Sequence, residues 1–214
     1  ASLLTGYSNK SFAHSIKTWV LISWSFQTIG ILAGGRATRM NSQDKGLMLV
    51  HGIPIIKKII NKIENNSNNI VINANRNISK YESFNSQVIQ DSLSDFQGPL
   101  AGIYSMLKNI RTNYLFTVPC DCPNFDWNVV KKFIDNFEET KDIHVAHNSL
   151  RSQPVFMLIS KSMIDPLHDY LMSGNRKIDI FYKKNNFKYV YFNEDTSYFD
   201  NINTIEQLDE YNSK

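Results

Sequence analysis

Blocks of hydrophobic residues along this chain predict strands and helices in alternation. Short uninterrupted apolar runs are typical of buried strands, whereas apolar residues that recur every three or four positions are typical of helices. By this criterion the predicted strands cover residues 29–33, 70–73, 88–90, 114–118, 143–146, 155–159 and 189–192. The predicted helices cover residues 54–64, 99–110, 128–137, 163–172 and 176–182, and a closing helix begins at Thr204.

This alternation predicts an α/β fold. Strands that read as continuous apolar runs, with helices between them, form a largely parallel sheet that helices cover on both faces. We therefore expect a single three-layer αβα domain with a Rossmann-like, mostly parallel sheet over residues 28–214.

Residues 1–27 do not follow the alternating pattern, and we interpret them as an N-terminal extension. The sequence is compatible with an ordered arm, a disordered tail or residues translated from an upstream start. A secretory signal is disfavoured, because Ser23 and Ser25 interrupt the apolar stretch and no small-residue cleavage site is clear.

Composition restricts the class of protein. The chain has 214 residues, of which 42% are hydrophobic and 20% charged, as is ordinary for a globular domain. A net charge of +3 is too small to indicate nucleic-acid binding, and no apolar run approaches the ~20 residues that cross a bilayer. The two cysteines are too few for a disulfide framework. We therefore expect a cytoplasmic protein without a nucleic-acid or membrane partner.

The cysteines do not predict a zinc site either. Cys120 and Cys122 flank Asp121, but two thiolates are half of a structural zinc site and no second pair completes it. His144 and His147 are three residues apart in a predicted strand, so their side chains should point to opposite faces. We expect Cys120 to be a packed thiol.

Polar or glycine residues follow the first four predicted strands. They are Gly34, Asn73, Asp91 and Asp121. Each alone could be a helix cap or a turn former. In open parallel sheets, however, ligands bind beyond the carboxyl ends of the strands, so the four together favour one shared site.

The loop after the first strand carries the strongest signal. It begins Leu32-Ala33-Gly34-Gly35, and Arg39, Asp44 and Lys45 follow at fixed offsets. The two glycines let backbone N–H groups approach an anion, and Arg39 and Lys45 add two positive charges, which suits a nucleoside triphosphate. The loop is neither a Walker loop nor a dinucleotide fingerprint. The alternative is an ordinary strand-to-helix turn with surface charge.

Asp121 is the best candidate for a metal ligand. Mg²⁺ prefers carboxylate oxygen, and one or two protein groups usually hold it together with phosphates. An aspartate directly after a buried strand would lie at the sheet edge, where a triphosphate can reach it.

Several motifs in the same order resemble the molybdenum cofactor guanylyltransferases, a family of nucleotidyltransferases. The resemblance covers about residues 28–212 and departs from the family where Asn41-Ser42-Gln43 follows Arg39-Met40. It rests on the loop motif, on Val71-Ile72-Asn73-Ala74-Asn75-Arg76, Asp91-Ser92-Leu93-Ser94-Asp95, Gly98-Pro99-Leu100-Ala101-Gly102, Pro119-Cys120-Asp121 and Asn201-Ile202-Asn203-Thr204. It implies the fold of the nucleotide-diphospho-sugar transferases.

The resemblance implies that GMP is transferred from GTP to the terminal phosphate of molybdopterin in a Mg²⁺-dependent reaction. The catalytic groups would be Lys45, Arg39 and Asp121. The GTP site would comprise Leu32, Ala33, Gly34, Gly35, Lys45, Asn73, Asp91, Gly98 and Asp121. Asn203 would add a second metal ligand, or would simply cap the closing helix.

The resemblance places the pterin site in the second half of the chain. Its residues would be Arg151, Gln153, Arg176 and Lys177, although Arg176 and Lys177 also read as a solvated helix face. We expect a monomer that makes transient contacts with other cofactor-biosynthesis proteins or molybdoenzyme chaperones. The alternatives are a cytidylyl- or sugar-phosphate nucleotidyltransferase on the same scaffold, or a nucleotide-binding protein without turnover.

Overall fold

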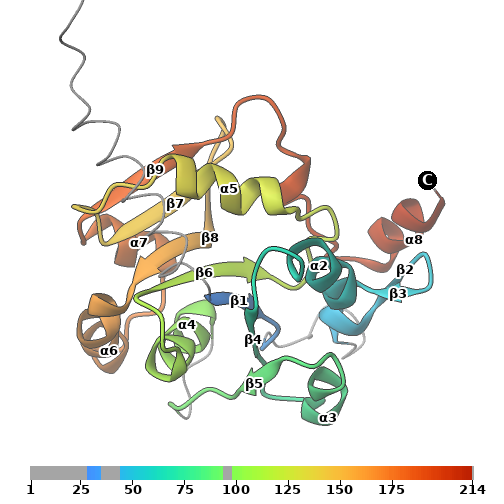
Figure 1. Ribbon diagram of the computed structural model, residues 1–214, viewed down its shortest axis with the longest axis horizontal. Coiled ribbons are helices and arrows are strands. Elements are labelled where there is room, and N and C mark those ends of the chain that lie inside the picture. The colour runs from blue at the N-terminus through green and yellow to red at the C-terminus, as the bar shows by residue number, and fades with distance from the viewer. Residues whose placement is uncertain (1–27, 35–43, 94–97, 214) are drawn as a thin grey trace, which may run out of the picture.

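A seven-stranded sheet forms the centre of the computed structural model, which describes residues 28–34, 44–93 and 98–213 (Figure 1). The strand order is β5-β4-β1-β6-β8-β7-β9, and β8 is antiparallel to both of its neighbours whereas the other pairs are parallel. The strands are β1 (Thr28–Leu32), β4 (Asn69–Asn73), β5 (Gln87–Ile89), β6 (Tyr114–Pro119), β7 (Ile143–His147), β8 (Ser152–Ser160) and β9 (Phe187–Tyr191). The predicted mostly parallel sheet is thus confirmed.

The register brings the ends of the central strands to one level. Leu32 at the end of β1 pairs with Asn73 at the end of β4 and with Pro119 at the end of β6. The segments that follow these strands therefore leave the sheet at the same edge, and we call this the carboxyl edge.

Helices cover both faces of the sheet and make three layers. On one face α2 (Ile55–Ile63) and α5 (Trp127–Asp135) pack on the sheet. On the other face lie α4 (Pro99–Asn109), α6 (Ile164–Met172) and α7 (Ile178–Lys183). Figure 1 shows α5 on the opposite side of β6 from α4 and α6.

Helix α2 shows how the sequence produces this packing. Its apolar positions recur at helical spacing and all point toward the sheet, where they are at most 2% exposed: Ile55, Ile56, Ile59, Ile60 and Ile63. The predicted helix began one residue earlier, at Pro54, but that residue pairs with Leu49 in a short hairpin.

That hairpin is one of the elements the sequence pattern did not predict. It consists of β2 (Leu49–Val50) and β3 (Ile53–Pro54), and the short helix α3 (Ile78–Glu82) was also missed. Two-residue strands and a five-residue helix are too short to show a periodic pattern. The 3₁₀ turns η1 (Lys45–Leu47), η2 (Lys161–Met163) and η3 (Ser197–Phe199) were missed for the same reason.

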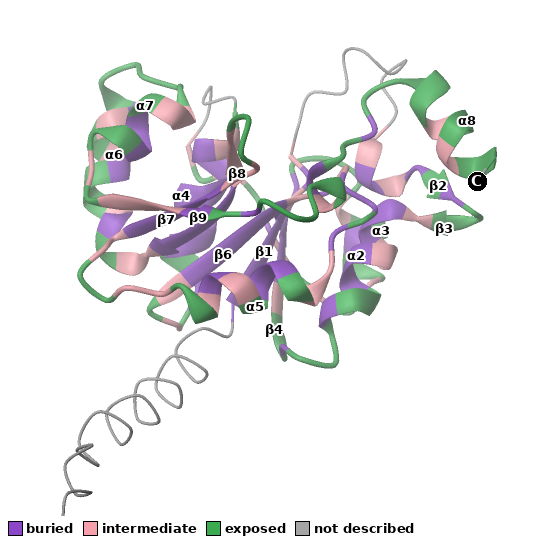
Figure 2. Ribbon diagram, turned by 90° about the horizontal axis from the view of Figure 1, so that it is seen from above, coloured by how far each residue is buried: buried purple, intermediate pink, exposed green. Residues whose placement is uncertain are grey.

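The closing helix is present as α8 (Ile205–Ser213), and it contains no buried residue. Figure 2 shows it exposed at one end of the molecule, while the central strands β1 and β6 are buried. Two hydrogen bonds link it to the hairpin: the Asn212 side chain accepts from the His51 N–H at 2.6 Å and donates to the Leu49 carbonyl at 3.3 Å. Helix α8 is held by these bonds and by the partly buried Leu208 and Tyr211, which pack against the core.

Three predictions lie outside the described residues: the N-terminal extension of residues 1–27, and the loop residues Gly35 and Arg39. Among the helices that the structure does describe, none combines the length and the apolar character that crossing a membrane requires.

Candidate active site at the carboxyl edge of the sheet

Three side chains from distant parts of the chain meet at the carboxyl edge. The Lys45 ammonium donates to a carboxylate oxygen of Asp121 at 3.0 Å and to the amide oxygen of Asn203. The side chains of Lys45 and Asp121 are 27% and 13% exposed, so the ion pair is partly screened from solvent yet open to a ligand. We call these three residues the lysine cluster. The expected proximity of Lys45 and Asp121 is thus observed.

Local structure explains why these side chains converge. Asp121 follows β6, and its carbonyl accepts from the Ile202 N–H at 2.9 Å, which ties the C-terminal segment to the end of the strand. Lys45 is the first residue of η1, and its side chain reaches Asp121 from that turn. The cluster therefore joins the loop after β1, the segment that follows β6 and the segment before α8.

Asn203 does not cap the closing helix, which was one of the two predicted roles. Thr204 Oγ1 accepts from the Gln207 N–H at 3.2 Å, and Gln207 Oε1 accepts from the Thr204 N–H at 3.2 Å. This reciprocal arrangement is a capping box. Because Thr204 and Gln207 satisfy the helix start, the Asn203 side chain is left for Lys45.

A second polar cluster lies beyond β4 and β5. Asn73 Nδ2 donates to Asp91 Oδ1 at 2.8 Å, and Asn75 Nδ2 donates to Asp91 Oδ2 at 2.9 Å. Asn75 Oδ1 in turn accepts from the Asp91 N–H at 2.8 Å. We call these three residues the amide network. Both oxygens of the Asp91 carboxylate are thereby held in a fixed orientation.

Gly34 and Gly102 leave room for the side-chain oxygen of Asn73, Oδ1. An added Cβ would lie 3.0 Å from Asn73 Oδ1 at Gly34 and 2.2 Å from it at Gly102. Asn73 is 2% exposed, and its Nδ2 also donates to the Ile89 carbonyl at 3.0 Å. The close approach of these glycines fixes the position of an amide oxygen beside the loop after β1.

The other predicted residues of the nucleotide site border these clusters. Leu32 ends β1 and the Ala33 N–H donates to the Asn73 carbonyl at 2.8 Å, so this segment continues along β4. Gly98 has a φ of 134°, a left-handed conformation that favours glycine, directly before Pro99 at the start of α4.

The two cysteines beside Asp121 are buried thiols. Burial, together with the nearby Asp121 carboxylate, raises the pKa of both Cys120 and Cys122 above the usual range of a thiol. A protonated thiol is a poor metal ligand and a poor nucleophile. Their observed role is packing in the hydrophobic core, as expected for Cys120.

The two histidines of β7 face opposite sides of the sheet, as predicted. His144 stacks on Phe137 with 5.3 Å between ring centroids, whereas His147 contacts Tyr189 at 5.1 Å. Burial lowers the pKa of His144 to about 4, and its Nε2 accepts from the Glu138 N–H at 3.0 Å. Over the described ranges of the chain, His, Cys, Asp and Glu nowhere gather in threes that could hold a metal ion.

A cleft of about 450 Å³ opens on the Asn203 side of the lysine cluster. Two residues predicted for the pterin site, Arg151 and Gln153, line it together with Asn203. The rest of the lining was not predicted from the sequence; it consists of Asn148, Thr196, Phe199, Asp200, Asn201, Gln207, Glu210 and Tyr211. Most of these residues lie in irregular segments or on α8, where no strand end marks them.

The other two residues predicted for the pterin site do not line this cleft. Arg176 and Lys177 lie between α6 and α7, and the Arg176 guanidinium donates to the carbonyls of Leu171 and Asn175 at 3.1 and 2.7 Å. These bonds close the C-terminal end of α6. The structure therefore does not bring Arg176 into one cleft with Arg151.

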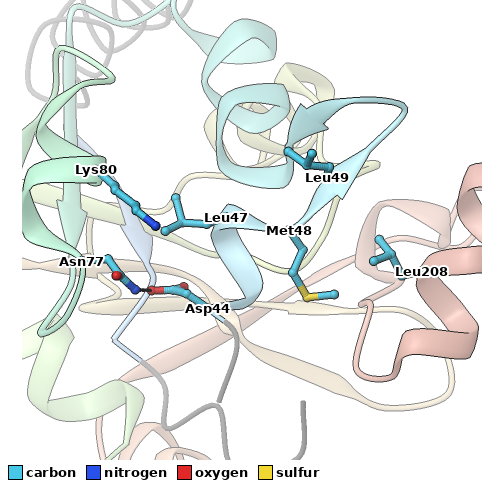
Figure 3. A pocket seen from close by; sticks show the side chains of 7 residues that line it. All are labelled: Asp44, Leu47, Met48, Leu49, Asn77, Lys80 and Leu208. Carbon is cyan, nitrogen blue, oxygen red and sulfur yellow. Dashed lines mark hydrogen bonds between the residues drawn. The ribbon is translucent and has the colours of Figure 1, made fainter. Parts of the chain in front are cut away.

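A second cleft, of about 480 Å³, lies on the outer side of the segment that carries Lys45. It is lined by Asp44, Leu47, Met48, Leu49, Asn77, Lys80 and Leu208. Figure 3 shows the side chains of Asn77 and Asp44 pointing toward each other and joined by a hydrogen bond. Two contacts were not predicted from the sequence: Asn75 bonds to Asp91, and Asn77 bonds to Asp44. Both asparagines follow Asn73 at every second position, and this spacing was the signal that could have indicated them.

Comparisons with known proteins agree with this geometry. A family model described as the MobA-like NTP transferase domain matches residues 29–186. A molybdenum cofactor guanylyltransferase from Vibrio atlanticus is 42% identical over 181 residues, which are 85% of this chain and 93% of the relative. A protein of the same name from Shewanella putrefaciens is 42% identical over 183 residues, again 85% and 93% of the two chains.

Solved structures show the same fold at low sequence identity. Molybdopterin-guanine dinucleotide biosynthesis protein A from Archaeoglobus fulgidus has a TM-score of 0.71 at 21% identity, over 87% of this chain and 97% of that chain. A 4-diphosphocytidyl-2C-methyl-D-erythritol synthase from Anaerococcus prevotii has a TM-score of 0.69 at 11% identity, over 91% and 97%. Sequence, family model and fold agree, and the chain belongs to the family of MobA-like NTP transferases.

Proposed function

We propose that this chain is a molybdenum cofactor guanylyltransferase, which transfers GMP from GTP to the terminal phosphate of molybdopterin and releases pyrophosphate. The observation that carries the proposal is the lysine cluster, in which one ammonium lies between a carboxylate and an amide oxygen at the carboxyl edge of the sheet. The relatives that bear this name match most of the chain.

The reaction needs no protein nucleophile. A terminal phosphate oxygen would bond to the α-phosphorus of GTP, and the bond from that phosphorus to pyrophosphate would break. A phosphate monoester has its second pKa at about 6, so it is already an anion near neutral pH. The remaining barrier is repulsion between anions and the charge that builds on pyrophosphate, which positioned cations lower.

Lys45 supplies one such cation. Its ammonium lies on a flexible stem and is bound by two acceptors, so it can exchange one of them for a phosphate oxygen. Backbone N–H groups beside Gly34 would add further donors, as would Arg39, which lies outside the described residues. Together these groups would neutralise the triphosphate.

Asp121 and Asn203 fit a hard divalent cation. Both present an oxygen to the point that the Lys45 ammonium occupies, and a carboxylate with a neutral amide oxygen suits Mg²⁺. Such an ion would neutralise charge on the phosphates and orient them. The protein's part is to hold the two oxygens at one place.

The amide network would bind the nucleoside of GTP. The Asp91 carboxylate is held by Asn73 and Asn75, and the Asn73 amide oxygen lies beside Gly34. Guanine presents N–H donors that pair with such acceptors, and ribose hydroxyls do so as well. Gly98 would let the chain pass close to the base.

The cleft beside Asn203 would take molybdopterin. Arg151 supplies a guanidinium suited to a phosphate, and Gln153 supplies an amide. The cleft adjoins Asp121 through Asn203, so a phosphate bound there would lie beside the triphosphate. Arg176 and Lys177 do not line this cleft and are not part of the proposed site.

The test is product formation with each nucleoside triphosphate in turn. The chain is incubated with Mg²⁺, molybdenum-loaded molybdopterin and GTP, CTP, UTP or ATP, and pyrophosphate and the dinucleotide are measured. We expect both products with GTP. A cytosine dinucleotide as main product would indicate a cytidylyltransferase instead, and GTP binding without any pyrophosphate would indicate a binding protein.

A further inference from the structure

One buried hydroxyl touches both chain neighbours of Lys45. Tyr81 lies on α3 and is 0% exposed, and its hydroxyl donates to Asp44 Oδ1. On the other side of Lys45, a Cβ added to Gly46 would lie 2.8 Å from the Tyr81 hydroxyl oxygen. The backbone of Gly46 is therefore packed directly against this hydroxyl.

A second bond from α3 holds the same carboxylate. Asn77 Nδ2 donates to Asp44 Oδ2 at 3.1 Å (Figure 3). Together with the bond from the Tyr81 hydroxyl, each oxygen of Asp44 thus has one donor from α3 or its N-cap. Asn77 stands at the N-cap of α3 with φ 51°, but its side chain makes no capping bond. An asparagine at this position usually bonds to the helix start, and here it bonds to Asp44 instead.

Gly46 also lies against the segment after β6, which carries Asp121, the partner of Lys45. The same Cβ at Gly46 would lie 3.2 Å from Cys120 Cβ, and Cys120 immediately precedes Asp121. Gly46 is thus wedged between Tyr81 and Cys120, which leaves the Lys45 backbone little freedom. Burial raises the pKa of Tyr81 far above the usual range, so its hydroxyl is a permanent donor.

We propose that Tyr81 is a positioning residue: it fixes Asp44 and Gly46, and thereby aims the Lys45 ammonium at the phosphates of the nucleotide. This inference rests on the proposed function. A lysine side chain has many rotamers, and misplacement of a charged group by about 1 Å is enough to slow a reaction strongly. Two anchors beside Lys45 reduce that freedom at the backbone.

The test compares two fully buried tyrosines. Tyr81→Phe removes the hydroxyl and keeps the ring. Tyr182→Phe is the matched control, because Tyr182 is also 0% exposed and its hydroxyl forms a hydrogen bond with the Tyr189 hydroxyl at 3.3 Å. We expect Tyr81→Phe to lower kcat for pyrophosphate release about tenfold, with KM for GTP changed less than about twofold. Tyr182→Phe should leave both unchanged.

A double-mutant cycle separates positioning from general destabilisation. If Tyr81 acts through Lys45, then Tyr81→Phe causes no further loss of kcat in a Lys45→Met background. An unchanged kcat in the single variant would overturn the proposal, and so would a full additional loss in the double variant. If Tyr81→Phe does not fold, Asn77→Ala is used instead, because it removes the other hydrogen bond to Asp44. A kcat equal to that of the unmodified chain would then overturn the proposal.

Failure of the proposed function would be recognised separately. If the unmodified chain releases no pyrophosphate from GTP with molybdopterin, the same cycle is measured on GTP affinity by calorimetry. Additive effects of Tyr81→Phe and Lys45→Met on affinity would then refute the positioning role, and non-additive effects would support it.

Discussion

The lysine cluster and the amide network lie at the same edge of the sheet but are built differently. The amide network joins residues at most 18 positions apart, whereas the lysine cluster joins residues 76 and 158 positions apart. In the amide network the Asp91 carboxylate has donors on both oxygens, so it is a fixed template. In the lysine cluster one ammonium holds two acceptors and can exchange them.

This difference suggests that the two clusters have different roles in binding and catalysis. A local, satisfied network suits recognition of a nucleoside, which needs acceptors in fixed places. A long-range cluster centred on a flexible cation suits phosphates, whose charge distribution changes during the reaction. The contrast predicts that changes in the lysine cluster reduce turnover, while changes at the amide network reduce GTP affinity.

The largest effect is expected at Asp121. Asp121→Asn keeps the shape of the side chain but removes the charge, and we expect kcat for pyrophosphate release to fall at least about 100-fold. The matched control is Asp135→Asn, since Asp135 is an exposed carboxylate that pairs with Lys131 at 2.7 Å. A near-normal rate in Asp121→Asn would show that the lysine cluster is not the catalytic centre.

The next effect is expected at Gly102, beside the amide network. A Cβ there would lie 2.2 Å from Asn73 Oδ1 and 2.7 Å from Leu32 Cδ2, so Gly102→Ala must displace the amide. We expect GTP affinity, measured by calorimetry, to fall about tenfold. In an Asn73→Ala background the same substitution should cost much less affinity. An unchanged affinity in the single variant would mean that Asn73 does not contact GTP.

A smaller effect on turnover is expected at Asn203. Asn203→Ala leaves Lys45 bound to Asp121, so we expect kcat to fall by about fivefold, as for the loss of one hydrogen bond. Asn185→Ala is a suitable control, because Asn185 bonds to the Phe181 carbonyl at the end of α7. Equal rates for Asn203→Ala and the control would remove Asn203 from the catalytic cluster.

The smallest effect is expected away from both clusters, at His144, and concerns stability only. The pKa of His144 is lowered to about 4, below the ~6.5 of an unfolded histidine, so between these values the unfolded chain binds the additional proton. The contribution to stability is therefore complete above pH 6.5 and is lost as the pH falls toward 4. Its slope is at most about 1.4 kcal/mol per pH unit.

Urea unfolding of His144→Gln measures this contribution. The variant should lose less stability than the unmodified chain between pH 6.5 and 4.5, because glutamine does not titrate there. His168→Gln, at a histidine whose side chain is 41% exposed, serves as the control and should follow the unmodified chain. Identical pH profiles for all three proteins would contradict the role given to burial of His144.

The same contrast explains what the sequence could predict. Isoleucines at helical spacing predicted α2, and polar residues at strand ends predicted that Asn73, Asp91 and Asp121 lie at one edge. These features are local, or follow from parallel topology alone. The hairpin β2–β3 and helix α3 were too short to produce a pattern.

Contacts that depend on the whole fold could not be predicted. Thr204 and Gln207 provide the hydrogen bonds that cap the start of α8, so the Asn203 side chain is not needed there. Only for this reason can it bond to Lys45. The Tyr81 hydroxyl reaches Asp44 only because α3 packs beside η1. Periodicity and spacing place the backbone of such residues but not the direction of their side chains.

A structure of the chain with GTP and Mn²⁺ would show whether the lysine cluster binds the metal and the triphosphate. We expect an anomalous peak beside Asp121 and Asn203, and a Lys45 ammonium that has turned from one of these oxygens to the phosphates. The guanosine should then contact Asn73 or Asp91. A metal and triphosphate bound elsewhere, with the Lys45–Asp121 pair unchanged, would show that the lysine cluster is not the catalytic centre.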